Sequence, residues 1–285
     1  MGDGRAAHLL GVSLVIASAL VFSLAGVLTK MIQADAWTIA CWRGLIGGLL
    51  ILAYVAWSRR ESVWLGWRGW LLASVGSAAS LAFIFAFKMT YIANVAVIYA
   101  AAPFIAAGLA WWLLRERLTG PTAVAAVLSL VGVAVVVMGG LGGGQLAGDL
   151  VALVMTLGNA LYMVLIRAFR DSPVVLAGGA SALQLFLIAW LVVDPLAVSP
   201  DDVPLLIAFG ASFALAVVLW TEGTRLIPAA EAGLLGTAET PFAAVLAWLL
   251  LSELPPPASF VGGAIVLAAV FGHAYRSRQH SSSAP

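Results

Sequence analysis

Apolar runs of similar length follow one another along almost the whole chain, separated by short polar or glycine-containing turns. A helix needs about 20 apolar residues to cross the ~30 Å hydrocarbon core of a bilayer, where only helices and closed barrels satisfy their own backbone hydrogen bonds. The runs therefore predict an all-α integral membrane protein. We expect ten transmembrane helices, at residues 9–28, 36–57, 67–87, 93–114, 122–138, 149–167, 173–193, 204–222, 229–251 and 259–275.

Composition agrees with a membrane location and excludes several classes of partner. Of the 285 residues, 63% are hydrophobic and 9% are charged, which is too few charges to cover a soluble globule with a hydrated surface. A net charge of +1 without a long basic run gives no electrostatic footprint for nucleic acid. The expected surroundings are the lipid bilayer.

Side chains that catalyse reactions or bind metals are not grouped in the sequence. The histidines lie near the ends of the chain, at positions 8, 273 and 280, without the helical spacing of metal ligands. The one cysteine, Cys41, cannot form a disulfide within the chain, and its apolar neighbours indicate a small buried side chain. The sequence therefore predicts no enzyme activity, no bound metal and no cofactor.

One segment of the first half of the chain is repeated in the second half. Residues 91–118 and 226–254 both contain Pro-Phe, then Leu-Ala-Trp, then Leu-Leu and a glutamate. Such a match indicates an internal duplication. The glycine-rich residues 139–148 separate the copies, because glycine sustains a helix poorly. We assign residues 1–140 and residues 141–285 to two repeats of five helices each.

Lysine and arginine are distributed unevenly between the two sides of the predicted helices. Eleven of the 14 fall at the termini or in turns on the side of the termini, and only Lys30 and Lys88 fall on the other side. By the positive-inside rule, this places both termini in the cytoplasm and the protein in the cytoplasmic membrane. Because five is an odd number, the second repeat must cross the membrane in the opposite sense to the first.

Inverted five-helix repeats are the architecture of many secondary transporters, which hold substrate near the membrane midplane and alternate access by rocking one repeat against the other. The residues also resemble a known family, the EamA branch of the drug/metabolite transporter superfamily. The matching motifs are Pro-Phe, Leu-Ala-Trp and Glu-Arg-Leu at residues 103–118, and Pro-Ala-Ala-Glu-Ala, Glu-Thr-Pro-Phe, Leu-Ala-Trp, Glu and Val-Gly-Gly-Ala-Ile-Val-Leu at residues 228–267. The resemblance covers nearly the whole chain. It implies ten helices, a central cavity and export of a small metabolite.

Two prolines lie near the centres of apolar runs. Pro103 and Pro241 lack a backbone N–H, so each is expected to break its helix and to free the carbonyl four residues earlier, that of Tyr99 or Thr237. A free carbonyl at membrane depth is tolerated where it faces protein or water, so we expect the breaks to line a cavity. The alternative is a kink that only shapes the bundle.

Polar and aromatic side chains within the predicted spans are candidate substrate contacts. Asn159 and Tyr162 lie three residues apart, on one helix face, and can bond to a substrate carboxylate or carbonyl. Tyr99 and Trp220 are further candidates. For each of them the alternative is packing or hydrogen bonding between helices.

Charged residues within predicted spans are costly and indicate function. Glu239 lies about 15 Å inside its helix, at a rise of 1.5 Å per residue. We expect it to carry a coupling proton or to pair with a substrate amine; the alternative is a structural hydrogen bond or a pair with Arg43. We expect Arg43 to form a structural pair with a carboxylate or to extend to the membrane surface. Glu116 and Glu253 lie at helix ends, where solvated roles are expected.

Together these features predict a secondary transporter that exports a small metabolite, such as an amino acid, by alternating access. A multiply charged phosphate would need several Lys or Arg side chains in the membrane, whereas an aromatic cavity with one carboxylate suits a zwitterion or an apolar amine. Alternatives are a carrier of drugs or sugar phosphates, and a structural or assembly subunit without transport. The small residues Gly44 and Gly48, and Ala264, Ala268 and Gly272, indicate close helix contacts within the chain or between protomers, so the oligomeric state stays open.

Overall fold

The computed structural model describes residues 2–58, 64–142 and 144–282, which are helical apart from short connections. The helices are α1 (Gly2–Met31), α2 (Ala36–Ser58), α3 (Gly66–Met89), α4 (Ile92–Tyr99), α5 (Ala102–Leu114), α6 (Gly120–Gly139), the 3-10 turn η1 (Gly140–Gly142), α7 (Leu146–Ala168), α8 (Val174–Trp190), α9 (Val203–Thr224), α10 (Ala229–Gly236), α11 (Glu239–Leu251) and α12 (Pro257–Ser282).

Helix length and hydropathy fit a multi-pass membrane protein. Eight segments of the described chain are long and apolar enough to cross a bilayer, and the pair α4 and α5 forms one of these segments. Two shorter apolar helices, Val174–Trp190 and Pro257–His273, occupy the remaining predicted spans. The predicted all-α membrane fold is therefore confirmed.

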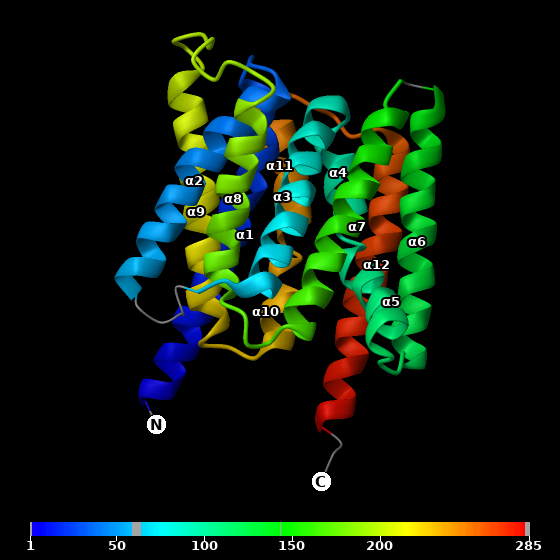
Figure 1. The fold of residues 1–285 in the computed structure, drawn as a ribbon. Coiled ribbons are helices and arrows are strands. Elements are labelled where there is room, and N and C mark those ends of the chain that lie inside the picture. The colour runs from blue at the N-terminus through cyan, green and yellow to red at the C-terminus, as the bar shows by residue number, and fades with distance from the viewer. Residues whose placement is uncertain (1, 59–63, 143, 283–285) are drawn as a thin grey trace.

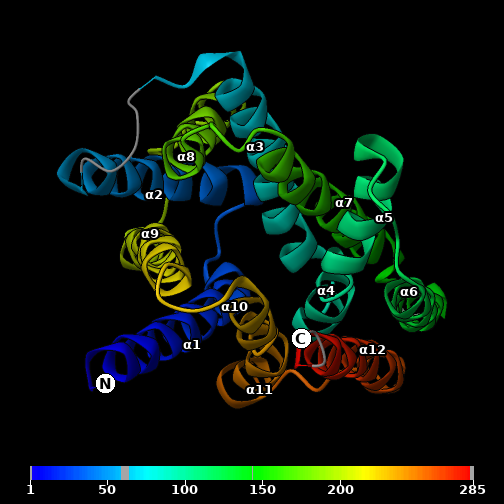
Figure 2. The same cartoon turned by 90° about the horizontal axis from the view of Figure 1, so that it is seen from below.

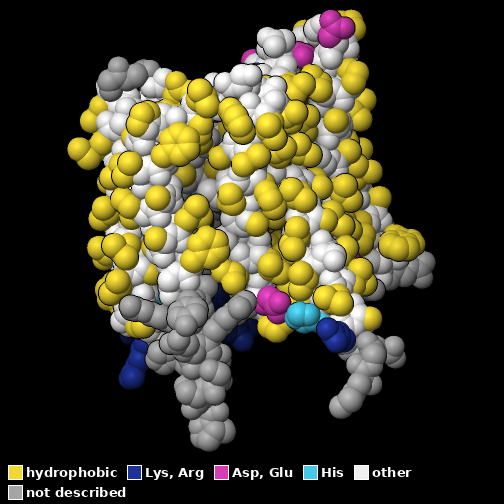
Figure 3. Space-filling view, turned by 180° about the vertical axis from the view of Figure 1, so that it is seen from behind, with side chains coloured by type: hydrophobic (Ala, Val, Ile, Leu, Met, Phe, Trp, Pro, Cys, Tyr) yellow, Lys and Arg dark blue, Asp and Glu magenta, His cyan; other side chains and the backbone are white. Residues whose placement is uncertain are grey.

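Both chain termini lie at one end of the bundle, here called the terminal end, and the opposite end is called the far end (Figure 1). Helix α1 starts at the terminal end, whereas α7 starts at the far end, so the two helices run in opposite directions. Seen along the bundle, α2, α8 and α9 lie on one side, and α5, α6 and α12 lie on the other (Figure 2). Hydrophobic side chains cover the flanks, and the visible Lys and Arg side chains gather at the terminal end (Figure 3).

Glycines allow two helix pairs to approach closely. A Cβ at Gly44 would lie 2.5 Å from the Ala182 carbonyl oxygen of α8, and a Cβ at Gly262 of α12 would lie 2.4 Å from the Gly132 carbonyl oxygen of α6. The predicted contact at Gly44 therefore lies within the chain. By contrast, the small residues Ala264, Ala268 and Gly272 are exposed on α12, and the open space beside Gly272 shows that this stripe faces outward.

The far end is closed by apolar packing between helices of both halves. Fully buried side chains from α2, α3 and α9 and from the α1–α2 connection meet there, and we call this group the far-end plug: Ile32, Ile39, Ile84, Leu206 and Phe209. Hydrogen bonds hold the α1–α2 connection in place beside this plug. The Asp202 carboxylate accepts hydrogen bonds from the Gln33 N–H (2.9 Å) and the Ala34 N–H (2.8 Å), and the Lys88 ammonium donates to the Ile32 carbonyl (2.6 Å).

Helix α2 begins directly after a capping residue in this connection. The Asp35 carboxylate accepts hydrogen bonds from the Trp37 N–H (2.8 Å) and from the Thr38 hydroxyl (2.6 Å). Burial acts to raise the pKa of the Asp35 carboxyl, but these hydrogen bonds outweigh burial and hold the pKa below its usual value. The start of α2 is therefore fixed by an ionised cap.

Two ion pairs tie helices together at opposite ends of the bundle. At the far end Lys30 of α1 pairs with Glu253 beyond α11, and Glu253 also accepts from the Ile92 N–H (2.6 Å). At the terminal end Arg167 of α7 pairs with Glu116 beyond α5 (2.9 Å). The Glu253 side chain is only 11% exposed, against 38% for Glu116. The expected solvated role of Glu253 is therefore wrong, because the start of α4 folds over the carboxylate and supplies a donor.

A second far-end contact joins the first turn of α7 to α4. The Asp149 side chain is fully buried, and its Oδ1 accepts from the Thr90 hydroxyl (2.6 Å) and the Asn94 amide (2.9 Å). Ser259 of α12 in turn donates to the Asn94 amide oxygen. Within the described residues, Asp149 Oδ2 has no partner. This group of polar side chains joins three helices and leaves Asn94 in a packing role.

Candidate functional site

A cavity of about 320 Å³ lies inside the bundle, between α1, α2, α3, α7, α8 and α9. Its lining extends to Ile166, Val174 and Thr221, which lie close to the terminal-end limits of their helices, and it stops at Phe209 of the far-end plug. The volume falls in the range of small-molecule sites. The cavity therefore extends toward the terminal end and is blocked toward the far end.

Two helix breaks bring Tyr99 and Glu239 to the cavity wall. Helix α4 ends at Tyr99, and α11 begins at Glu239, in each case close to the proline that follows. At the first residue of α11 the Glu239 carboxylate lies at the positive end of a helix dipole, which favours a negative charge. Glu239 thus lies beside the break, and not in mid-helix as predicted.

The two prolines at the helix breaks do not line the cavity themselves. Pro103 and Pro241 are exposed and are not among the residues that line the cavity. The Thr237 carbonyl, predicted to be free, accepts a hydrogen bond from the Thr240 N–H (3.2 Å), so that prediction is wrong. The chain tightens to an i→i+3 turn at the break, and this turn satisfies the carbonyl that the proline leaves behind.

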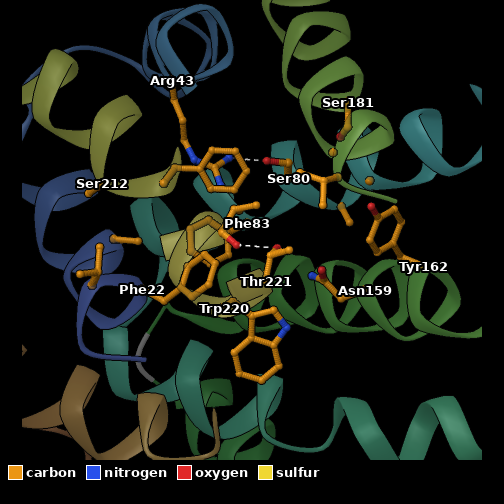
Figure 4. Close-up of a pocket in the computed structure, with 18 of the residues that line it drawn as sticks. Phe22, Arg43, Ser80, Phe83, Asn159, Tyr162, Ser181, Ser212, Trp220 and Thr221 are labelled. Atoms are coloured by element: carbon orange, nitrogen blue, oxygen red, sulfur yellow. Dashed lines mark hydrogen bonds between the residues drawn. The ribbon is translucent and has the colours of Figure 1, made fainter. Parts of the chain in front are cut away.

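Arg43 points from α2 into the cavity and is only 6% exposed (Figure 4). Its Nη1 donates a hydrogen bond to the Ser80 hydroxyl of α3, and its Cζ lies 4.0 Å from the centroid of the Phe213 ring. The rings of Phe209 and Phe83 lie 5.3 Å and 5.4 Å away. In the described chain no carboxylate lies within ion-pair distance of Arg43, so the expected structural pair is not formed and the side chain does not reach the membrane surface.

The remaining predicted contacts come from α7 and α9. Asn159 and Tyr162 line the cavity from one face of α7, and the Asn159 amide donates to the Met155 carbonyl of its own helix (3.1 Å). Trp220 lines it from α9, with its indole packed against Gly236 at the end of α10. The structure therefore brings all six predicted side chains to one cavity, namely Arg43, Tyr99, Asn159, Tyr162, Trp220 and Glu239.

Several lining residues were not predicted. Hydroxyl groups line the cavity at Ser80, Ser181, Ser212 and Thr221, and Phe22 and Phe83 add aromatic surface. Serine and threonine are common between membrane helices as packing contacts, so the sequence carries no signal that separates these from others. Over the described residues, no group of three or more His, Cys, Asp or Glu side chains is placed to hold a metal ion.

A bundle of apolar helices around a partly polar cavity is the arrangement of a membrane transporter. The EamA-like transporter family matches residues 9–138 and 146–274, one match in each half of the chain. The chain therefore belongs to the EamA-like transporter family, whose members are membrane transporters and not enzymes.

Among solved structures, 27 chains are similar to this one. One of them, a crystal structure of a protein, has a TM-score of 0.66 at 19% sequence identity, over 96% of this chain and 98% of that chain. Such a likeness supports the fold alone. No curated protein matches the chain.

Proposed function

We propose that this protein is a secondary transporter that moves a small metabolite across the cytoplasmic membrane by alternating access. The observation that carries the proposal is a cavity whose wall holds one cation, Arg43, and one carboxylate, Glu239, neither of which forms an ion pair within the described residues. Ionisable groups without an ion-pair partner are costly in a membrane bundle, and in transporters they mark substrate or ion pathways. A structural subunit would gain nothing from keeping them.

Ten crossings in two inverted repeats, residues 1–140 and 141–285, form part of the proposal. Its support comes from the paired contacts of the bundle. Arg167 and Glu253 each lie 137 residues after Lys30 and Glu116, so the two ion pairs are copies of one contact at opposite ends. Helix α1 packs on α9 and α11, and correspondingly α7 packs on α3 and α5.

The proposed orientation has both termini in the cytoplasm. Its support is the concentration of arginine at the terminal end, including Arg68, Arg115, Arg117 and Arg225. In this orientation the cavity extends toward the cytoplasm and the far-end plug closes the outer side. That arrangement suits the loading of a substrate for export.

An amino acid is the substrate class that we propose. A cavity with one cation, one carboxylate and several aromatic rings suits a zwitterion with an apolar side chain, whereas a multiply charged phosphate would call for more cations. Glu239 then pairs with the substrate amine or exchanges a proton for it. Tyr99, Asn159, Tyr162 and Trp220 supply hydrogen bonds and ring contacts.

The proposal is tested by counterflow into liposomes preloaded with one unlabelled amino acid at a time. We expect wild-type protein to accumulate the labelled form of at least one neutral amino acid, and Ser212→Trp to lose this activity because the indole fills the cavity. The matched control is Leu215→Trp, on the exposed side of the same helix, which should retain it. If no amino acid exchanges faster than in protein-free liposomes, the amino acid assignment is rejected.

A further inference from the structure

The guanidinium of Arg43 is the charged group for which the bundle provides least compensation. It is buried, its one hydrogen bond to a side chain goes to the neutral Ser80 hydroxyl, and within the described residues its Nε has no partner. The surrounding ring faces of Phe83, Phe209 and Phe213 attract a cation but carry no charge and accept no strong hydrogen bond. Among the described residues no carboxylate forms an ion pair with it.

Leaving a cation buried without an anion is unfavourable, and removing one partner of a buried pair is strongly destabilising. Guanidinium presents five N–H donors in a planar fork that matches a carboxylate with two parallel hydrogen bonds. In this structure the Ser80 hydroxyl accepts from Nη1, which fixes the plane of the group, and among the described residues the buried Nε has no partner. A carboxylate is therefore the anion that best matches this group.

The position of Arg43 along the cavity defines the direction of entry. Phe83 and Phe209, which pack against the guanidinium, also contact or belong to the far-end plug, so Arg43 lies at the closed end of the cavity. A solute that enters from the terminal end must pass Thr221 and Trp220 before it reaches Arg43. A single anionic group at the leading end of the solute satisfies the site, whereas a second one would find no other Lys or Arg among the residues that line the cavity.

We propose that Arg43, oriented by Ser80, forms a carboxylate-binding subsite at the closed end of the cavity and selects solutes that carry one carboxylate. The inference rests on the proposed transport function and names the group of the substrate that the α2 wall recognises. It assigns to Arg43 a direct contact with the solute, in place of a structural pair within the protein.

Two probes of the same shape test the subsite, 3-phenylpropionate and its amide, 3-phenylpropanamide. Binding to purified protein is followed by calorimetry and by intrinsic tryptophan fluorescence, to which Trp220 in the cavity wall contributes. For the wild type we expect a Kd for the carboxylate about tenfold or more below that of the amide, as for a charge-assisted hydrogen bond. Arg43→Met should abolish this preference, and Arg43→Lys should retain part of it, because an ammonium keeps the charge but lacks the planar fork.

Arg68→Met is the control, because it removes an exposed arginine outside the cavity and should leave the preference unchanged. Thermal unfolding shows whether each variant is folded. If Arg43→Met does not fold, Ser80→Ala is measured in its place, because this substitution removes only the hydroxyl that orients Arg43. Equal Kd values for the two probes in the wild type, or failure of both to bind, would overturn the subsite. Counterflow of an amine without a carboxylate would also reject the subsite but leave transport intact, whereas absence of any exchange would reject transport itself.

Discussion

Among the acidic residues that the structure describes, Glu239 is distinguished by its place at a helix break beside the cavity, where it has no ion-pair partner. Burial favours the protonated carboxyl, whereas the positive end of α11 favours the carboxylate, which a bound proton or a bound ammonium can each neutralise. Because one of the two is sufficient, the same carboxyl group can exchange a proton for the substrate amine. This exchange would couple transport to a pH gradient.

Glu239→Gln keeps the size and most hydrogen bonding of the side chain but cannot ionise. We expect the variant, reconstituted in liposomes at wild-type density, to lose uphill transport driven by an imposed pH gradient and to bind substrate at least about tenfold more weakly, the loss typical of one charged contact. Persistent uphill transport would exclude the proton-carrier role. An unchanged affinity as well would exclude the pairing with the amine.

Candidate side chains could be recognised in the sequence because an ionisable or amide group within an apolar run is rare and costly. Their partners could not be recognised in the same way. Whether Arg43 meets Glu239, Ser80 or lipid depends on how α2 is rotated against α3 and α9, and that rotation is decided by packing over the whole bundle. Glu253 was misjudged for the same reason, since its donor at Ile92 comes from a distant part of the sequence.

Close packing of α6 on α12 depends on two glycines that face each other. Gly262→Leu would drive a side chain into the Gly132 backbone and the Val136 side chain, and overpacking of this kind costs about 1–3 kcal/mol or more. We expect a clear fall in the thermal unfolding temperature in detergent. Gly272→Leu lies on the same helix with nothing within 4 Å of the added Cβ and should leave the unfolding temperature nearly unchanged. If both substitutions lower the unfolding temperature equally, the cause is the loss of a glycine from α12 and not the contact with α6.

Helices were predictable from apolar length, since the bilayer fixes how many apolar residues a span must contain. Their breaks were located only approximately. A proline at 103 or 241 indicates a break, but the helices end earlier, at Tyr99 and Gly236, because the turn before each proline tightens to satisfy its own carbonyls. This shift moves Glu239 from mid-helix to the first turn of α11, a difference that changes its electrostatic environment.

At the far end, Lys30 and Glu253 join the two halves of the molecule above the plug. This pair is better shielded than its counterpart at the terminal end and has two further contacts, the Ile92 N–H and the Tyr91 ring, whose centroid lies 5.7 Å from Lys30 Nζ. In the proposed alternating-access cycle, opening of the far end would separate this pair. The pair therefore favours the conformation in which the far end is closed.

Lys30→Met should raise access to the cavity from outside the cell. With Cys41→Ala as background and Ser212→Cys as reporter, we expect labelling by an impermeant thiol reagent to increase several-fold over the protein with Lys30 intact. The physical reason is loss of a cross-half ion pair that would have to break in the proposed outward-open state. The rate of labelling on intact cells is the measurement.

Glu116→Gln is the matched variant, because it breaks the corresponding pair at the terminal end and should not raise labelling from outside. Asp201→Cys, exposed at the far end, tests the orientation itself and should label rapidly on intact cells. If Asp201→Cys is not labelled on intact cells, the proposed orientation is wrong. Unchanged labelling of Ser212→Cys in the Lys30→Met protein would show that the plug alone keeps the far end closed.

The general plan of the molecule was readable from its repeated segment, because a duplicated segment folds twice in the same way. The differences between the copies were not readable. The far-end pair is shielded and the terminal-end pair is half exposed, although both derive from corresponding positions, because each end is covered by different neighbours. Such asymmetry exists only in the assembled bundle.

The buried carboxylate of Asp149 has a consequence for the order in which the protein is made. Its hydrogen-bond donors, Thr90 and Asn94, precede it by more than fifty residues, so they leave the ribosome and enter the membrane before α7 does. A carboxylate inserted without them would remain unsatisfied, at a cost of about 1–3 kcal/mol or more. During synthesis α7 can therefore dock onto a partner that is already in place.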